Sequence, residues 1–151
     1  MRISRKWKVR ISTAIVLAIG IAVLEHFREK AQQHSIRLAC LNNMVEIGTA
    51  GRLWAEDHGG RFPTNFVCMS NELSTPYILR CPLDPDRRAA TDFVNITVQN
   101  ISYELLAPGL SITNTNTVVY RCPIHGLLGF ADARIESQSR KLISYTITAA
   151  K

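Results

Sequence analysis

This 151-residue sequence has almost no excess of positive over negative charge outside its first ten residues. The formal net charge is +6, and five of the positive charges belong to the N-terminal segment, so that the remaining residues carry only +1. These five residues are Arg2, Arg5, Lys6, Lys8 and Arg10. Proteins that bind nucleic acid present a basic face to the phosphates. Because the body of the chain has no such excess, we predict no nucleic-acid partner.

The sequence also has none of the common catalytic signatures. It contains no G-x-S-x-G nucleophile turn, no glycine-rich phosphate-binding loop and no H-E-x-x-H pattern. Cys122 and His125 could supply a nucleophile and its base, but the sequence places no third residue to orient the histidine. We therefore predict no enzymatic activity, no catalytic residue and no cofactor-binding residue. A thiol-dependent enzyme is the least favoured alternative.

Charge is missing altogether from Ile11–Leu24, which reads ISTAIVLAIGIAVL. At about 1.5 Å per residue this stretch covers about 21 Å as a helix, less than a hydrocarbon core of about 30 Å. Flanking residues extend it, and we predict a transmembrane or signal-anchor segment over 11–27. The preceding basic residues then predict a single-pass inner-membrane protein with a cytoplasmic N-terminus and a periplasmic body. A signal peptide cleaved after Ala22, or less favourably after Gly20, is the alternative.

A helical pattern continues beyond this stretch. Apolar residues recur at steps of three and four, the spacing that places side chains on one face of a helix. The predicted packing face consists of Ile36, Cys40, Met44, Ile47 and Trp54. Together with the preceding stretch, the pattern indicates one helix from residue 11 to about residue 57. Gly59 then favours the left-handed conformation that ends a helix, and Pro63 prevents the helix from resuming.

Short β-branched and aromatic runs follow Pro63, and turn residues such as Pro108-Gly109 separate them. The predicted strands are 77–79, 94–98, 101–106, 117–121, 127–131 and 142–148. A helix followed by strands favours an α+β fold in which a long N-terminal helix packs on a small antiparallel β-sheet. The predicted division is a basic N-terminus at 1–10, a membrane segment at 11–27, an amphipathic helix at 28–58 and a β-rich extracytoplasmic domain at 59–151.

Two of the four cysteines stand in similar frames, Arg-Cys-Pro-Leu-Asp at 80–84 and Arg-Cys-Pro-Ile-His at 121–125. Outside the cytoplasm we favour a disulfide between Cys81 and Cys122, with Cys40 either buried alone on the helix or paired with Cys68. The full pairing stays open. The alternative is a zinc site made by Cys81, Cys122, His125 and Asp84, because the C-x-x-H spacing is typical of zinc ligands.

Aspartates offer a second metal-binding pattern. Asp84, Asp86 and Asp132 could join backbone carbonyls around calcium, which prefers oxygen ligands. An Asp-Pro-Asp sequence is also common turn chemistry, and we favour the turn. We therefore predict no cofactor, with zinc and calcium as the alternatives.

The segment at 39–63, ACLNNMVEIGTAGRLWAEDHGGRFP, resembles the helix end of type IV pilin-like proteins, and above all of type II secretion pseudopilin-like proteins. The later motifs at 80–84, 102–103, 121–126 and 129–132 follow the pattern and order of that group. The resemblance covers roughly residues 36–135. It implies a pilin-like fold, in which the second half of an N-terminal helix packs on a small antiparallel sheet.

The resemblance also implies a function. It predicts a membrane-anchored pseudopilin-like subunit or accessory protein of a type II secretion or type IV pilus-like system. Such a protein acts by assembly with the membrane, with other pilin-like or secretion-system proteins, and with copies of itself through the N-terminal helix. The alternative is an extracytoplasmic zinc module built on the Cys-Pro motifs. The sequence departs from the family in lacking a recognisable prepilin cleavage site, because its apolar stretch precedes Gly20 instead of following it.

Overall fold

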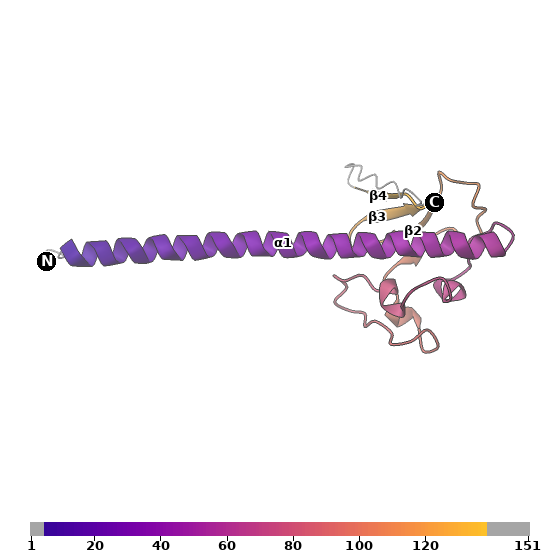
Figure 1. The fold of residues 1–151 in the computed structure, drawn as a ribbon, viewed down its shortest axis with the longest axis horizontal. Coiled ribbons are helices and arrows are strands. Elements are labelled where there is room, and N and C mark those ends of the chain that lie inside the picture. The colour runs from indigo at the N-terminus through magenta and orange to yellow at the C-terminus, as the bar shows by residue number, and fades with distance from the viewer. Residues whose placement is uncertain (1–4, 139–151) are drawn as a thin grey trace. The chain divides into compact units, whose positions relative to one another are not determined.

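The computed structural model describes residues 5–138, and its elements form an α+β fold, as predicted (Figure 1). Helix α1 spans Arg5–Asp57 and is followed by three short 3-10 helices. The 3-10 helices are η1 at Phe66–Met69, η2 at Pro76–Leu79 and η3 at Val98–Asn100. Four strands come last: β1 at Glu104–Leu105, β2 at Val118–Cys122, β3 at Leu127–Phe130 and β4 at Ile135–Ser137. The chain divides into two compact units, with the boundary between Ile36 and Arg37.

The end of α1 confirms the stop predicted from the glycines. Gly59 has a φ of 68°, a left-handed conformation that glycine adopts without steric cost. The backbone N–H of Gly60 donates to the carbonyl of Ala55 at 2.8 Å, which satisfies one of the open carbonyls at the helix end. The chain then turns back, and the N–H of Phe62 donates to the carbonyl of Leu110.

The four strands form one antiparallel sheet in the order β1-β2-β3-β4. The strands predicted at 117–121 and 127–131 correspond to β2 and β3, and β1 occupies two residues of the predicted 101–106. The strand predicted at 77–79 is wrong, because Thr75 caps a 3-10 helix with Pro76 in its first turn. No strand forms at 94–98, and β4 was not predicted. The strand predicted at 142–148 lies outside the described residues.

The hydrophobic core lies between the C-terminal part of α1, the sheet and the 3-10 helices, which gather around residues 37–57 in Figure 1. Cys40, Met44 and Ile47 of the predicted packing face are almost fully buried. Trp54 is half-buried and packs against the edge of this core, where its ring stacks on that of His58. Ile36, the first residue of the predicted face, is also half-buried. The residues at the two ends of the predicted packing face are therefore less buried than those in its middle.

The predicted membrane segment at 11–27 requires a correction. Among the described residues, no helix has both the length and the sustained apolar character that crossing a membrane requires. This finding overturns the predicted single-pass inner-membrane localisation, including the cytoplasmic N-terminus and the periplasmic body. The physical reason is that the uncharged stretch covers only about 21 Å of a hydrocarbon core of about 30 Å, and Glu25 follows it directly.

Candidate metal centre

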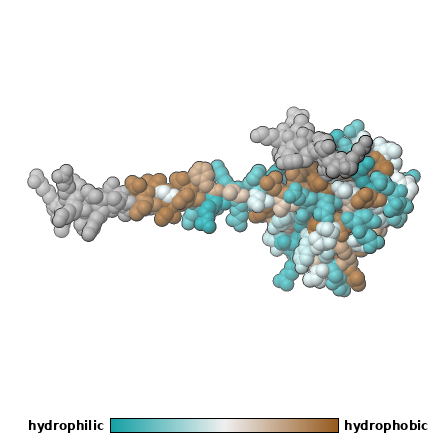
Figure 2. Space-filling view, viewed as in Figure 1, coloured by the Kyte–Doolittle hydropathy of each residue, from teal (hydrophilic) through white to brown (hydrophobic). Residues whose placement is uncertain are grey.

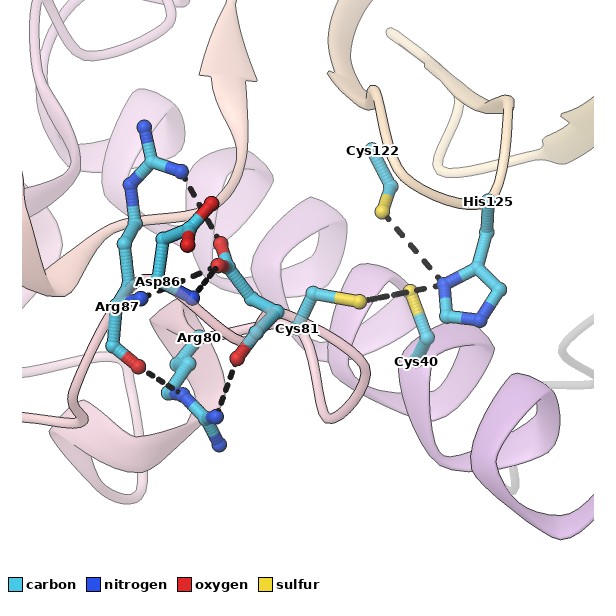
Figure 3. A network of polar contacts seen from close by, with 8 residues as sticks. Cys40, Arg80, Cys81, Asp86, Arg87, Cys122 and His125 are labelled. Carbon is cyan, nitrogen blue, oxygen red and sulfur yellow. Dashed lines mark hydrogen bonds and ion pairs between the residues drawn. The ribbon is translucent and has the colours of Figure 1, made fainter. Parts of the chain in front are cut away.

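Three separate segments bring four potential metal ligands together. Cys40 comes from α1, Cys81 follows η2, Cys122 ends β2, and His125 lies in the turn between β2 and β3. The three sulfur atoms and a ring nitrogen of His125 all lie within 4.8 Å of one another. Figure 3 shows the four side chains pointing toward a common centre, with Nδ1 of His125 facing the sulfurs.

Two tight turns position three of these residues. After Cys81, the chain reverses so that the N–H of Asp84 donates to the carbonyl of Cys81 at 2.9 Å. After Cys122, the turn passes through Gly126, whose φ of 61° lets the chain return as β3. This hairpin holds Cys122 and His125 side by side. The two similar Cys-Pro frames of the sequence therefore form the two loops that face α1.

The cysteines of the cluster form no disulfide in this structure. The Sγ atoms of Cys40 and Cys81 are 3.8 Å apart, whereas a disulfide has a sulfur–sulfur distance of about 2.05 Å. Nδ1 of His125 lies 3.2 Å from Sγ of Cys81 and 3.8 Å from Sγ of Cys122. In place of the predicted disulfide between Cys81 and Cys122, both residues are free thiols.

The three cysteines of the cluster are shielded from solvent. Cys40, Cys81 and Cys122 each have 0% relative exposure, and His125 is half-buried. The hydroxyl of the buried Tyr103 donates to Sγ of Cys40 at 3.6 Å. Burial raises the pKa of Tyr103, so its hydroxyl stays protonated and remains a hydrogen-bond donor.

The pKa values of the three cysteines are shifted in different directions. Hydrogen bonds from Cys40 and then Cys81 stabilise the thiolate of Cys122 and lower its pKa. The same interactions with Cys122, together with burial, raise the pKa of Cys40 and of Cys81. A thiolate is the form of cysteine that binds metals. Within the cluster, Cys122 is therefore the sulfur that gives up its proton most readily.

Asp84, the fourth zinc ligand predicted from sequence, has a different role. Its buried carboxylate accepts hydrogen bonds from the backbone N–H groups of Asp86 and Arg87 and forms an ion pair with the Arg87 guanidinium at 3.1 Å. Burial alone would raise the pKa of Asp84, but Ser102 and these donors outweigh it, and the pKa falls to about 2. Asp84 therefore fixes the loop that carries Cys81.

We expect Asp84→Asn to destabilise the fold by about 2 kcal/mol at neutral pH, because a pKa lowered from 3.8 to about 2 corresponds to about that free energy. A carboxylate with a depressed pKa stabilises the native state above its unfolded pKa. The difference between wild type and variant should therefore shrink as the pH falls from about 4 to about 2. Urea unfolding of both proteins across this range measures it. The exposed Asp86→Asn is the matched control, and an equal loss in both variants would contradict this role.

The remaining disulfide and calcium candidates are not brought to the cluster. Cys68 is exposed near the end of η1, with its Sγ 3.9 Å from Thr64 Oγ1, so it does not pair with the buried Cys40. Two of the three aspartates of the calcium alternative have other roles, since Asp84 holds its own loop and Asp132 forms an ion pair with Arg134. Sequence reasoning missed Cys40 as a possible ligand. Its position on the apolar face of α1 is equally typical of a core cysteine.

Comparison with known proteins gave no match to this chain among family models, curated proteins or solved structures.

Proposed function

We propose that this chain is a non-catalytic assembly subunit or accessory protein of the pilin-like kind, of the type found in type II secretion and type IV pilus-like systems. The α+β fold, with one helix and a small antiparallel sheet, supports this proposal. The order of motifs along residues 36–135 supports it as well. The chain acts by packing its helix against helices of other subunits.

The observation that carries the proposal is a band of exposed apolar side chains on α1 (Figure 2). Each of these large residues has a relative exposure between 47% and 67%. The band consists of Ile15, Val16, Leu17, Ile19, Ile21, Val23, Leu24 and Phe27. We call these residues the apolar band.

Water is an unfavourable environment for such a band. Covering a side chain such as Leu or Phe stabilises an association by about 1.5–3 kcal/mol. A helix that is apolar on all sides is normally enclosed by other helices or by other apolar surroundings. Helices from further copies of the chain provide matching apolar surfaces, so we propose self-association through the apolar band.

Substitution within the apolar band tests this proposal. Leu24→Glu should weaken self-association at least about 10-fold, because it removes an exposed leucine that association would bury and places a carboxylate in the apolar interface. Light scattering of the purified full chain over a range of concentrations, with chemical crosslinking, measures the effect. Gln32→Glu is the matched control, since it places the same side chain on an exposed, polar part of α1.

Two results would refute self-association. The wild-type chain could stay monomeric at every concentration, or Gln32→Glu could weaken association as much as Leu24→Glu does. The first result would show that the apolar band does not join copies. The second would show that charge alone, and not the apolar surface, controls association.

A metal-binding module is a second candidate function, and the cluster of thiols and imidazole favours it. The cluster and the apolar band share no residue, because the cluster ligands all come after Ile36 and the band ends at Phe27. A metal site that stabilises one part of the chain is therefore compatible with assembly through the other.

A further inference from the structure

We propose that Cys40, Cys81, Cys122 and His125 bind one Zn²⁺ ion, and that this ion is a structural link between α1, the loop after η2 and the β2–β3 hairpin. The ligand set differs from the one that the sequence suggested, because Cys40 takes the place of Asp84. The site would exist whether or not the chain assembles, since none of its ligands belongs to the apolar band.

Tetrahedral geometry supplies the first argument. Zinc–sulfur bonds are about 2.3 Å long and zinc–nitrogen bonds about 2.0–2.1 Å, so two ligand sulfurs stand about 3.8 Å apart and a sulfur and a nitrogen about 3.6 Å. The separation of Cys40 and Cys81 is 3.8 Å. Nδ1 of His125 lies 3.2 Å from Sγ of Cys81 and 3.8 Å from Sγ of Cys122. These two distances lie on either side of the sulfur–nitrogen separation of about 3.6 Å that zinc ligands have. The side chains are therefore spaced as ligands around one small ion.

The chemistry of the donors supplies the second argument. Three thiolates and an imidazole form a soft ligand set that suits zinc and disfavours calcium or magnesium. Four protein ligands fill a tetrahedron and leave no position open for water or substrate. Three of the four ligand side chains are fully buried, so substrate access is closed as well. The site is thus suited to a structural ion.

The surrounding contacts supply the third argument. The backbone N–H of Leu83 donates to Sγ of Cys81, and the backbone N–H of His125 donates to Sγ of Cys122. The hydroxyl of Tyr103 donates to Sγ of Cys40, so each sulfur has a donor besides the four ligand atoms. Such outer donors orient ligands and offset the excess negative charge of three thiolates around a divalent ion. Both Cys-Pro frames are therefore arranged as ligand-bearing loops.

A zinc ion at this site would connect segments that are far apart in the sequence. Cys40 is separated by 41 residues from Cys81, and the contact of their sulfurs joins the helix to a loop that contains no strand. A metal ion would add strong bonds at the place where α1, this loop and the hairpin meet. Metal binding is then coupled to folding, because the ligands come together only in the native state.

The full chain, purified under reducing conditions without chelator, provides the test. Elemental analysis should find one zinc per chain. Removal of zinc, followed by addition of Co²⁺, should give the visible bands of tetrahedral cobalt and a thiolate-to-cobalt charge-transfer band. Returning zinc at a thousand times its dissociation constant should raise the thermal midpoint by at least about 10 °C.

Variants of single ligands separate this site from adventitious binding. Cys40→Ser should lower zinc affinity at least about 100-fold, whereas the control Cys68→Ser should leave it unchanged, because Cys68 is exposed and outside the cluster. Equal zinc affinity in the two variants would overturn the site. A chain that binds less than a tenth of an equivalent of zinc would overturn it too.

A second variant keeps the test decisive if Cys40→Ser does not fold. His125→Cys replaces the imidazole by a fourth thiolate and preserves a tetrahedral soft ligand set. It should still bind one metal ion, and its thiolate-to-cobalt band should become stronger. A cobalt spectrum identical to that of the wild type would show that His125 does not bind the ion.

Discussion

The Gly48→Ala variant is expected to lose about 3 kcal/mol of stability, although alanine is the better helix former. A Cβ at position 48 would overlap the hydroxyl oxygen of Tyr120 and come within 3.1 Å of its ring carbon Cζ. Tyr120 has 2% relative exposure, and its hydroxyl donates to the carbonyl of Met44 at 3.0 Å. The ring cannot retreat, because its other side lies against Gly129.

The magnitude follows from three contributions. Overpacking a core costs about 1–3 kcal/mol, and losing the partner of a buried hydroxyl costs about 1–3 kcal/mol. Replacing glycine by alanine in a helix returns about 1 kcal/mol. The steric and polar costs exceed the gain in helix propensity. Urea unfolding followed by circular dichroism measures the net effect.

Tyr120→Phe provides the diagnostic partner for Gly48→Ala. Alone, it should cost about 1 kcal/mol, because it removes one hydrogen bond. Combined with Gly48→Ala, it removes the overlapping oxygen, so the double variant should be more stable than Gly48→Ala alone. Such coupling between neighbouring residues is what a double-mutant cycle detects.

Gly20→Ala is the control for helix propensity. A Cβ at Gly20 would meet no atom within 4 Å, so this variant should keep wild-type stability or gain up to about 1 kcal/mol. If Gly48→Ala were as stable as Gly20→Ala, α1 would not approach Tyr120 as closely as the structure has it. Additive losses in the double variant would point to the same error.

The helix and the main hairpin of this fold could be predicted because their signals are local. Apolar residues at steps of three and four indicated α1, and two glycines followed by Pro63 indicated its end. The runs at 117–121 and 127–131 are separated by a short turn, as in a hairpin. The predicted strand at 77–79 failed because its apolar residues are also suited to a capped 3-10 helix, and Pro76 decides between the two.

The candidate site was predictable only in part, because its ligands are brought together by tertiary structure. The C-x-x-H spacing of Cys122 and His125 is local and was found. Cys40 was missed, since a single cysteine on an apolar helix face has no spacing relation to ligands that lie on distant segments. Asp84 was included wrongly, because the sequence does not show that its carboxylate is already satisfied by Arg87 and two backbone N–H groups.

The two proposals concern different properties of the chain and predict independent results. Zinc binding should affect the stability of the part that contains α1 from Cys40 onward, the hairpin and the loop of Cys81. Assembly should depend on the apolar band alone. A chain with Leu24→Glu should therefore bind one zinc ion as tightly as the wild type. A chain with Cys40→Ser that remains folded should associate as the wild type does.

The Gly129→Ala variant is expected to lose at least about 3 kcal/mol, and Tyr120→Phe should not rescue it. A Cβ on Gly129 would overlap ring carbons of Tyr120, with Cδ2 at 2.8 Å, and phenylalanine retains these carbons. Gly129 pairs with Tyr120 in the β2–β3 ladder, so relief of the overlap requires these strands to shift. Because Cys122 and Leu127 pair in the same ladder, this shift should also weaken zinc binding at least about 10-fold, as displaced ligands do.

Gly51→Ala is the graded control for this effect. Its Cβ would lie 3.2 Å from ring carbons of Phe62, a tight contact that a small movement relieves, so we expect a loss below about 1 kcal/mol. Unfolding in urea measures the loss of stability of each variant, and titration with cobalt measures the metal affinity of its cluster. If Tyr120→Phe restored the stability of Gly129→Ala, the overlap would involve the hydroxyl and not the ring. The ring of Tyr120 would then not be held between α1 and β3, and the close approach of helix and sheet that brings Cys40 to the hairpin would be wrong.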